Sequence, residues 1–253
     1  MNMKKTMAVC MISIMFSGCA PSTGFRNVIE HPGNLELIYY GYMVDNPSTY
    51  KVRANGKDFF VTKSTVVPSI QSVFLLENTT INDGDEVLDI GTGAGIQAIF
   101  AAQKASRVVA TDLNQDAVND TIYNAKYHGL SSIIDARQGD LFGPVKENEK
   151  FDAIIFNIEY PYNEKNKGLW EVHERFFSQV KNHMKPGATI YYQAGWLWNI
   201  PKIVEMIENN DLIVQKMVMV NAYQMNRQPI VFVIQQHPNL NIKQNRLQQR
   251  QQD

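Results

Sequence analysis

The chain contains only two cysteines in 253 residues, and both lie near its start, at Cys10 and Cys19. This scarcity excludes a disulfide-rich scaffold and a zinc site with four cysteine ligands. An excess of basic residues is also absent, since 24 Lys and Arg residues are matched by 25 Asp and Glu residues, which gives no support for a basic nucleic-acid surface. The five histidines are scattered without the spacing of metal ligands, so no metal site is predicted. The 44% of hydrophobic residues suffice to bury a core.

The sequence also lacks a run of the roughly 18 apolar residues that a membrane-spanning helix requires. Its N-terminal apolar stretch, Met7–Phe16, would span about 15 Å as a helix, half of a bilayer core of about 30 Å. Two lysines precede this stretch, and the small residues Ser17 and Gly18 lead from it to Cys19. A basic start, a short apolar stretch and small residues in this order are typical of a secretory signal.

With the cysteine at its end, this segment resembles the lipobox of a bacterial lipoprotein signal. The resemblance implies that residues 1–18 are removed and that Cys19 is lipidated. The lipid would anchor the protein to a membrane, on the periplasmic side or at the cell surface, and stable attachment needs more than one acyl chain. The alternative is a cytoplasmic protein with an apolar N-terminal helix, in which Cys19 has no special role.

From residue 86 onward, apolar stretches alternate with helical stretches. The apolar stretches predict strands at Glu86–Ile90, Arg107–Thr111, Ile133–Arg137, Phe151–Asn157 and Ala188–Gln193. The stretches between most of them predict helices at Ile96–Ala105, Asn114–His128 and Leu169–Met184. This alternation predicts an α/β fold whose parallel sheet is covered by helices on both faces. After a helix at Ile200–Asn209, the strand-like stretches Leu212–Val220 and Pro229–Gln236 have no helix between them and predict an antiparallel hairpin.

The residues before this pattern are less regular. Residues 20–48 are mixed in composition, with Pro, Gly and Asn, and predict a tether that leads into irregular or partly helical structure. Asn55-Gly56 then separates Tyr50–Ala54 from Lys57–Thr62, which is a strong signal for a β-hairpin. Pro68 opens a further stretch with helical periodicity.

A glycine-rich loop, within VLDIGTGAGIQAI, follows the strand Glu86–Ile90 and opens a helix. This is the context that a nucleotide-type glycine loop requires, because glycine lets the backbone turn sharply and approach a ligand closely. The glycines are Gly91, Gly93 and Gly95, and Ile96 stands where the dinucleotide fingerprint G-x-G-x-x-G has its third glycine. An acid, Asp89, lies two residues before the first glycine.

At this loop the chain resembles the class I S-adenosylmethionine-dependent methyltransferases, whose motif is [DE]-x-G-x-G-x-G, and in particular those with a small domain, such as protein-glutamine methyltransferases. The resemblance implies that Asp89 and the loop line the methionine end of S-adenosylmethionine. It implies that Asp112 accepts bonds from the ribose hydroxyls and that Asp140 binds the adenine amino group. The implied cofactor site comprises Asp89, Gly91, Thr92, Gly93, Gly95, Asp112, Leu113, Asp140, Leu141 and Asn157.

The sequence FNIEYPY follows the fourth predicted strand, where methyltransferases of planar amino groups carry Asn-Pro-Pro-Tyr. Asn157 and Tyr160 keep the first and last positions, and Ile158 and Glu159 replace both prolines. The resemblance implies that Asn157 holds the acceptor nitrogen and that the ring of Tyr160 steadies the charge that develops on it. Simple packing is the alternative for Tyr160.

The resemblance implies a Rossmann-like, doubly wound sheet of seven strands, mostly parallel, with the C-terminal antiparallel hairpin. The predicted division is a signal at 1–18, a tether and N-terminal extension at 19–56, a methyltransferase domain at 57–236 and a frayed polar tail at 237–253. The implied activity is methyl transfer to nitrogen on a protein or small molecule rather than a nucleic acid, with the oligomeric state open.

Two alternatives come from other classes. An export signal ahead of the fold for a cytosolic cofactor motivates a catalytically silent lipoprotein that acts as a binding or structural protein. A nicotinamide oxidoreductase is the other, and Ile96 in place of the last fingerprint glycine argues against it.

Overall fold

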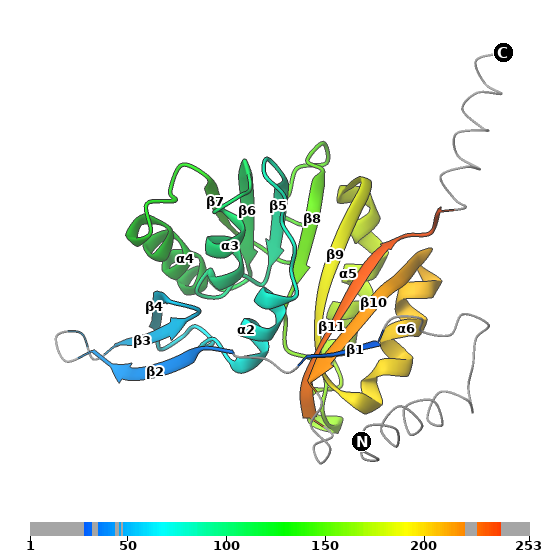
Figure 1. Cartoon of the computed structure of the whole chain (residues 1–253), viewed down its shortest axis with the longest axis horizontal. Helices are drawn as coiled ribbons and strands as arrows, with labels where there is room; N and C mark the ends of the chain where they lie inside the picture. Colours follow the sequence, from blue (N-terminus) through cyan, green and yellow to red (C-terminus); the bar gives the residue numbers. More distant parts are fainter. Residues whose placement is uncertain (1–27, 32–34, 44–45, 47, 221–226, 239–253) are drawn as a thin grey trace, which may run out of the picture.

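The computed structural model describes residues 28–31, 35–43, 46, 48–220 and 227–238, which form an α/β fold with two sheets (Figure 1). The predicted signal, its Cys19 and the tail from 239 onward lie outside the described residues. The large sheet contains, from one edge to the other, β1 (Val28–His31), β10 (Leu212–Val220), β11 (Arg227–Gln236), β9 (Met184–Trp196), β8 (Phe151–Phe156), β5 (Glu86–Ile90), β6 (Arg107–Asp112) and β7 (Ile134–Gln138). All neighbouring pairs are parallel except the two that β11 makes.

Helices cover both faces of this sheet, as the continuous apolar strands predict. One face packs against α2 (Ile70–Glu77), α3 (Ile96–Ala101) and α4 (Gln115–Tyr127), and the other against α5 (Leu169–Val180) and α6 (Ile200–Asn209). Along β8, Ala153 and Ile155 pack into the core on the face of α2, α3 and α4, while Ile154 and Phe156 pack into the core on the face of α5 and α6. The Rossmann-like fold and its antiparallel C-terminal hairpin are therefore confirmed.

The small sheet contains β2 (Leu37–Tyr42), β3 (Thr49–Ala54) and β4 (Lys57–Thr62), all antiparallel. The hairpin between β3 and β4 turns at Asn55 and Gly56, both with positive φ, as its sequence predicts. The buried side chain of Asn124 on α4 bonds the backbone N–H and carbonyl of Phe60, both at 2.9 Å. These bonds attach β4, and with it the small sheet, to the main domain.

Four predicted details are corrected by the structure. Residues 20–48, predicted as a tether with irregular or partly helical structure, contain two strands, β1 and β2, and no helix where they are described. β1 pairs with β10 and extends the sheet beyond the seven predicted strands to eight. β9 begins at Met184 rather than Ala188, with an irregular register to β8 where Gly187 has φ 81°. α3 ends at Ala101 and α5 at Val180, each before its predicted end.

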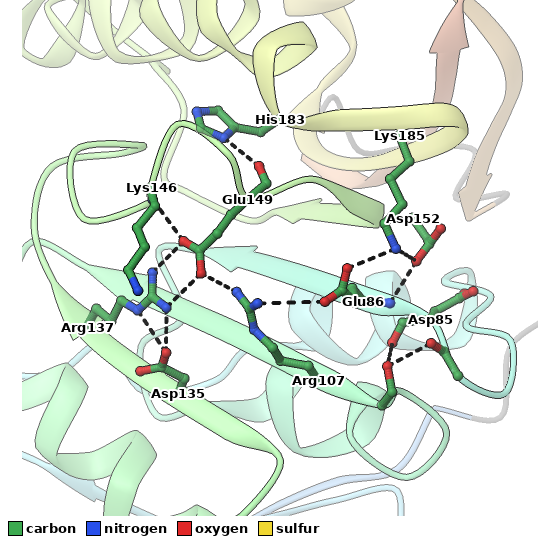
Figure 2. A network of polar contacts seen from close by, with 12 residues as sticks. Asp85, Glu86, Arg107, Asp135, Arg137, Lys146, Glu149, Asp152, His183 and Lys185 are labelled. Atoms are coloured by element: carbon green, nitrogen blue, oxygen red, sulfur yellow. Dashed lines mark hydrogen bonds and ion pairs between the residues drawn. The ribbon is translucent and has the colours of Figure 1, made fainter.

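A network of charged side chains joins the starts of β5, β6, β8 and β9 to Asp135 and Arg137 on β7 (Figure 2). Glu149 accepts from Arg137 at 2.7 Å and pairs with Arg107, and these guanidinium groups lower the pKa of Glu149 to about 2. Lys185 lies 2.9 Å from Glu86 and 2.8 Å from Asp152. Most of the network lies at the amino ends of β5, β6, β8 and β9. The carboxyl ends of these strands form the opposite edge of the sheet, where ligands bind in open α/β folds. In the described part of the chain, no helix is long and apolar enough to cross a membrane.

Candidate cofactor and acceptor site

The glycine loop connects β5 to α3 at the carboxyl edge of the sheet. The N–H groups of Gly91 and Thr92 both donate to the carbonyl oxygen of Thr111 on the neighbouring β6, at 2.8 and 3.0 Å. Gly93 has φ 56°, and a Cβ added there would meet no atom closer than the Val66 carbonyl oxygen at 4.0 Å. The loop is thus fixed to the sheet, and the space beside Gly93 is free of side chains.

Asp89 is buried beneath this loop, and only one of its two carboxylate oxygens has hydrogen-bond partners among the described residues. Its Oδ2 accepts from the Thr92 hydroxyl at 2.7 Å and from the Ala98 N–H at 3.2 Å. Its Oδ1 is buried and has no hydrogen-bond partner among the residues that the structure describes. Burial raises the pKa of Asp89 to about 7, the nearby Asp112 adds to the rise, and the two hydrogen bonds oppose it. A buried carboxylate in this state favours a cationic ligand group beside its second oxygen.

Asp112 ends β6 and faces the glycine loop. Its Oδ2 accepts from the Gly93 N–H and its Oδ1 from the Asn114 N–H, both at 2.9 Å. These two bonds orient the carboxylate, and each oxygen keeps a further lone pair for a hydroxyl donor. The neighbouring Leu113 is 69% exposed, so its side chain is available to a ligand at this edge.

Asp140 follows β7, but its carboxylate already has a partner. It forms an ion pair with Arg175 of α5 at 2.5 Å, and half of its side chain is exposed. Leu141 beside it is buried, has φ 47°, and its carbonyl oxygen lies 3.3 Å from the Thr111 hydroxyl. An adenine amino group would therefore share Asp140 with Arg175, and the adenine role of Asp140 stays a prediction.

Asn157 lies on the same edge, directly after β8. Since β8 pairs with β5, the loop that begins at Asn157 runs beside the glycine loop. A Cβ at Gly91, which has φ 73°, would come within 2.5 Å of Ile158 Cγ1, so only glycine permits this close approach. The Asn157 amide nitrogen lies 3.3 Å from the hydroxyl oxygen of Ser72 on α2. The structure thus brings Asn157 and the glycine loop together.

Tyr160 is buried rather than presented to the site. Its residue is 5% exposed, and its hydroxyl accepts from the amide of Gln71 on α2 at 2.5 Å. A Cβ at Gly195 of β9 would overlap the Tyr160 ring and hydroxyl. The packing alternative describes this side chain, and a catalytic role for Tyr160 stays a prediction.

Sequence reasoning missed the residues of other elements that hold the acceptor loop, by which we mean residues 157–163 after β8. Gln71 and Ser72 come from α2, and His173 and Tyr192 come from α5 and β9. They lie far from the loop in sequence and form no motif, so no local signal marks them. Among the described residues, no group of three or more His, Cys, Asp or Glu side chains could hold a metal ion.

The fold and the site together define a Rossmann-like domain of the methyltransferase class. Residues 67–221 match the model of the methyltransferase small domain, which is more than half of the chain. The chain therefore belongs to the methyltransferase small domain family. This membership confirms the sequence-based assignment to the S-adenosylmethionine-dependent methyltransferases and does not support the silent alternative.

Similar proteins extend the comparison. The chain is 31% identical over 143 residues to a ribosomal protein uL3 glutamine methyltransferase of Bradyrhizobium diazoefficiens, covering 50% of this chain and 44% of that protein. It is 32% identical over 138 residues to a Methanocaldococcus jannaschii protein named as an N5-glutamine methyltransferase, covering 49% and 68%. A solved ribosomal protein L11 methylase of Lactobacillus delbrueckii has a TM-score of 0.55 at 21% identity, over 70% of this chain and 83% of that chain. The likeness to the solved L11 methylase shows the fold alone. The chain spans less than half of the length of the Bradyrhizobium protein.

Proposed function

We propose that the chain binds S-adenosylmethionine at the glycine loop and transfers its methyl group to a nitrogen atom held at Asn157. The observation that carries this proposal is the pairing of β5 with β8, which sets Asn157 beside the glycine loop and the half-satisfied Asp89. The cofactor, when bound, supplies an activated methyl group on a sulfonium. The chain then has to position the acceptor in line with that group and exclude competing water.

Three side chains divide this work. Asp89 binds the ammonium group of the cofactor in this proposal, which the lack of a hydrogen-bond partner at its Oδ1 among the described residues supports. Asp112 accepts from the ribose hydroxyls in this proposal, and its bonds to the Gly93 and Asn114 N–H groups, which fix its orientation, support this role. Asn157 holds the acceptor nitrogen in this proposal, and the contact of its amide with the Ser72 hydroxyl supports a fixed orientation.

A planar amide in a protein is the acceptor class that we favour. The two relatives described above are named for glutamine methylation, one of them on a ribosomal protein. Asn157 offers both a donor and an acceptor, which match the oxygen and nitrogen of such an amide. The balanced net charge of −1 argues against a nucleic-acid acceptor.

Asp112→Ala is expected to raise the dissociation constant of S-adenosylmethionine by about 10- to 100-fold, because hydrogen bonds to a charged group contribute about 1.5–3 kcal/mol. Calorimetric titration of the full chain measures this change. Asp83→Ala is the matched control, since Asp83 is an exposed acid before β5. Absence of heat and of a thermal shift up to millimolar cofactor with the wild-type chain would refute the cofactor proposal.

We also propose that Cys19 is lipidated and anchors the chain to a bacterial membrane. The order of lysines, apolar stretch, small residues and cysteine supports this. In bacteria fed labelled palmitate, Cys19→Ser is expected to abolish the label and release the protein from the membrane fraction. Cys10→Ser, which changes the other cysteine of the segment, is expected to retain both, and undiminished label in Cys19→Ser would contradict the proposal.

A further inference from the structure

His173 on α5 is wholly buried, and both of its ring nitrogens have partners. Its Nε2 lies 3.1 Å from the backbone carbonyl oxygen of Glu159, and its Nδ1 lies 2.8 Å from the hydroxyl oxygen of Tyr192 on β9. A carbonyl oxygen can only accept, so Nε2 carries the proton and donates it. Nδ1 therefore accepts from the Tyr192 hydroxyl, and the two bonds define a single tautomer of a neutral imidazole.

The protonation states of this pair are firmly set. Burial lowers the pKa of His173 to about 4, the bond to the Glu159 carbonyl oxygen opposes this, and Lys202 adds to the lowering, so the ring is neutral at pH 7. Burial also raises the pKa of Tyr192 far above its ordinary value, so its hydroxyl stays protonated. Tyr192 itself packs among aromatic rings, with Phe156 stacked 5.5 Å away. The Tyr192 hydroxyl and the His173 ring thus form an uncharged relay of two hydrogen bonds that ends at the Glu159 carbonyl oxygen, and neither group acts as an acid or a base at pH 7.

The relay ends on the acceptor loop. Glu159 lies between Asn157 and Tyr160, at one of the two positions where the Asn-Pro-Pro-Tyr motif has proline. Proline fixes φ, so its loss gives this loop backbone freedom that other contacts must remove. Beyond the relay, Asn199 donates to the Pro161 carbonyl oxygen at 2.7 Å. Among the hydrogen bonds of the described residues, only the one from His173 reaches the Glu159 backbone, which lies between Asn157 and Tyr160.

We infer that His173, oriented by Tyr192, is a positioning residue that fixes the Glu159 carbonyl and through it the Asn157 side chain. His173 does not contact the acceptor. It substitutes for the missing prolines by holding the loop from α5, so that Asn157 stays beside the glycine loop. This role rests on the proposed function, because it matters for catalysis only if Asn157 holds a methyl acceptor.

Three variants separate positioning from simple packing. His173→Phe leaves the Tyr192 hydroxyl buried without a partner, which lowers the melting temperature and frees the loop. The double variant His173→Phe with Tyr192→Phe removes that orphan hydroxyl and recovers most of the melting temperature, but the Glu159 carbonyl still lacks a donor. His173→Gln keeps an amide donor for Glu159 and an amide oxygen for Tyr192.

Hydrogen–deuterium exchange of the full chain is the direct measurement. We expect exchange in the segment 157–163 to rise at least tenfold in both phenylalanine variants and to return toward wild type in His173→Gln. Methyl transfer to total bacterial protein should follow the exchange and not the melting temperature, while affinity for S-adenosylmethionine stays within threefold. Recovery of wild-type exchange in the double variant would overturn the inference and leave the pair as core packing. A wild-type chain that fails to bind S-adenosylmethionine would refute the proposed function instead, and the exchange comparison would still decide the role of His173.

Discussion

Replacing Asn157 by alanine is expected to lower methyl transfer by about 100- to 1,000-fold, because an acceptor that is no longer held in line rarely reaches the methyl group. Affinity for S-adenosylmethionine should change far less, by no more than about tenfold, since the proposed polar contacts to the cofactor come from Asp89 and Asp112. Single-turnover transfer of labelled methyl groups to total bacterial protein measures the rate, and calorimetry measures the binding.

The Ser72 contact allows a graded test of this role. Ser72→Ala removes the hydroxyl that lies 3.3 Å from the Asn157 amide, but it leaves Asn157 in place, so a loss of about tenfold is expected. Asn119→Ala is the matched control for Asn157→Ala, because Asn119 is an exposed asparagine on α4. Transfer by Asn157→Ala within threefold of wild type would show that another residue holds the acceptor.

The sequence was sufficient for the main sheet because its strands and helices are marked by local patterns. β5 and β6 begin at their predicted residues, and the apolar runs of both strands are buried on both faces. β1 was missed because it has only four residues and its partner β10 lies nearly two hundred residues away, at Val28↔Met217. Such a pairing depends on the folded edge of the sheet and leaves no periodicity in the sequence.

The placement of several candidate residues at one edge of the sheet was predictable in the same way. Asp89, Asp112 and Asn157 lie at one edge because the carboxyl ends of parallel strands share that edge of the sheet. The ion pair of Asp140 with Arg175 was not predictable, since Arg175 lies on α5, 35 residues further along the chain, and no local pattern links the two. The burial of Tyr160 likewise depends on the absence of a side chain at Gly195, which no spacing indicates.

Affinity for S-adenosylmethionine is expected to fall about tenfold for each pH unit below 7. Burial raises the pKa of Asp89 to about 7, so below that pH a proton occupies the carboxylate that the cofactor ammonium needs. Titrations between pH 5.5 and 8 measure the slope. Asp89→Asn should bind weakly at every pH, and any slope that it retains reports the ligand's own titration.

The same carboxylate makes an opposite prediction for stability, which separates this effect from acid unfolding. An acid whose pKa is raised in the folded state holds its proton more tightly there, so unfolding becomes easier as the pH rises from about 4 to about 7. Without ligand, Asp89 thus destabilises the fold over the range in which it gains affinity for the cofactor. Asp89→Asn should remove both trends together. A wild-type chain that binds equally well at pH 5.5 and 7.5 would show that the ionised Asp89 does not contact the cofactor, whatever the stability profile.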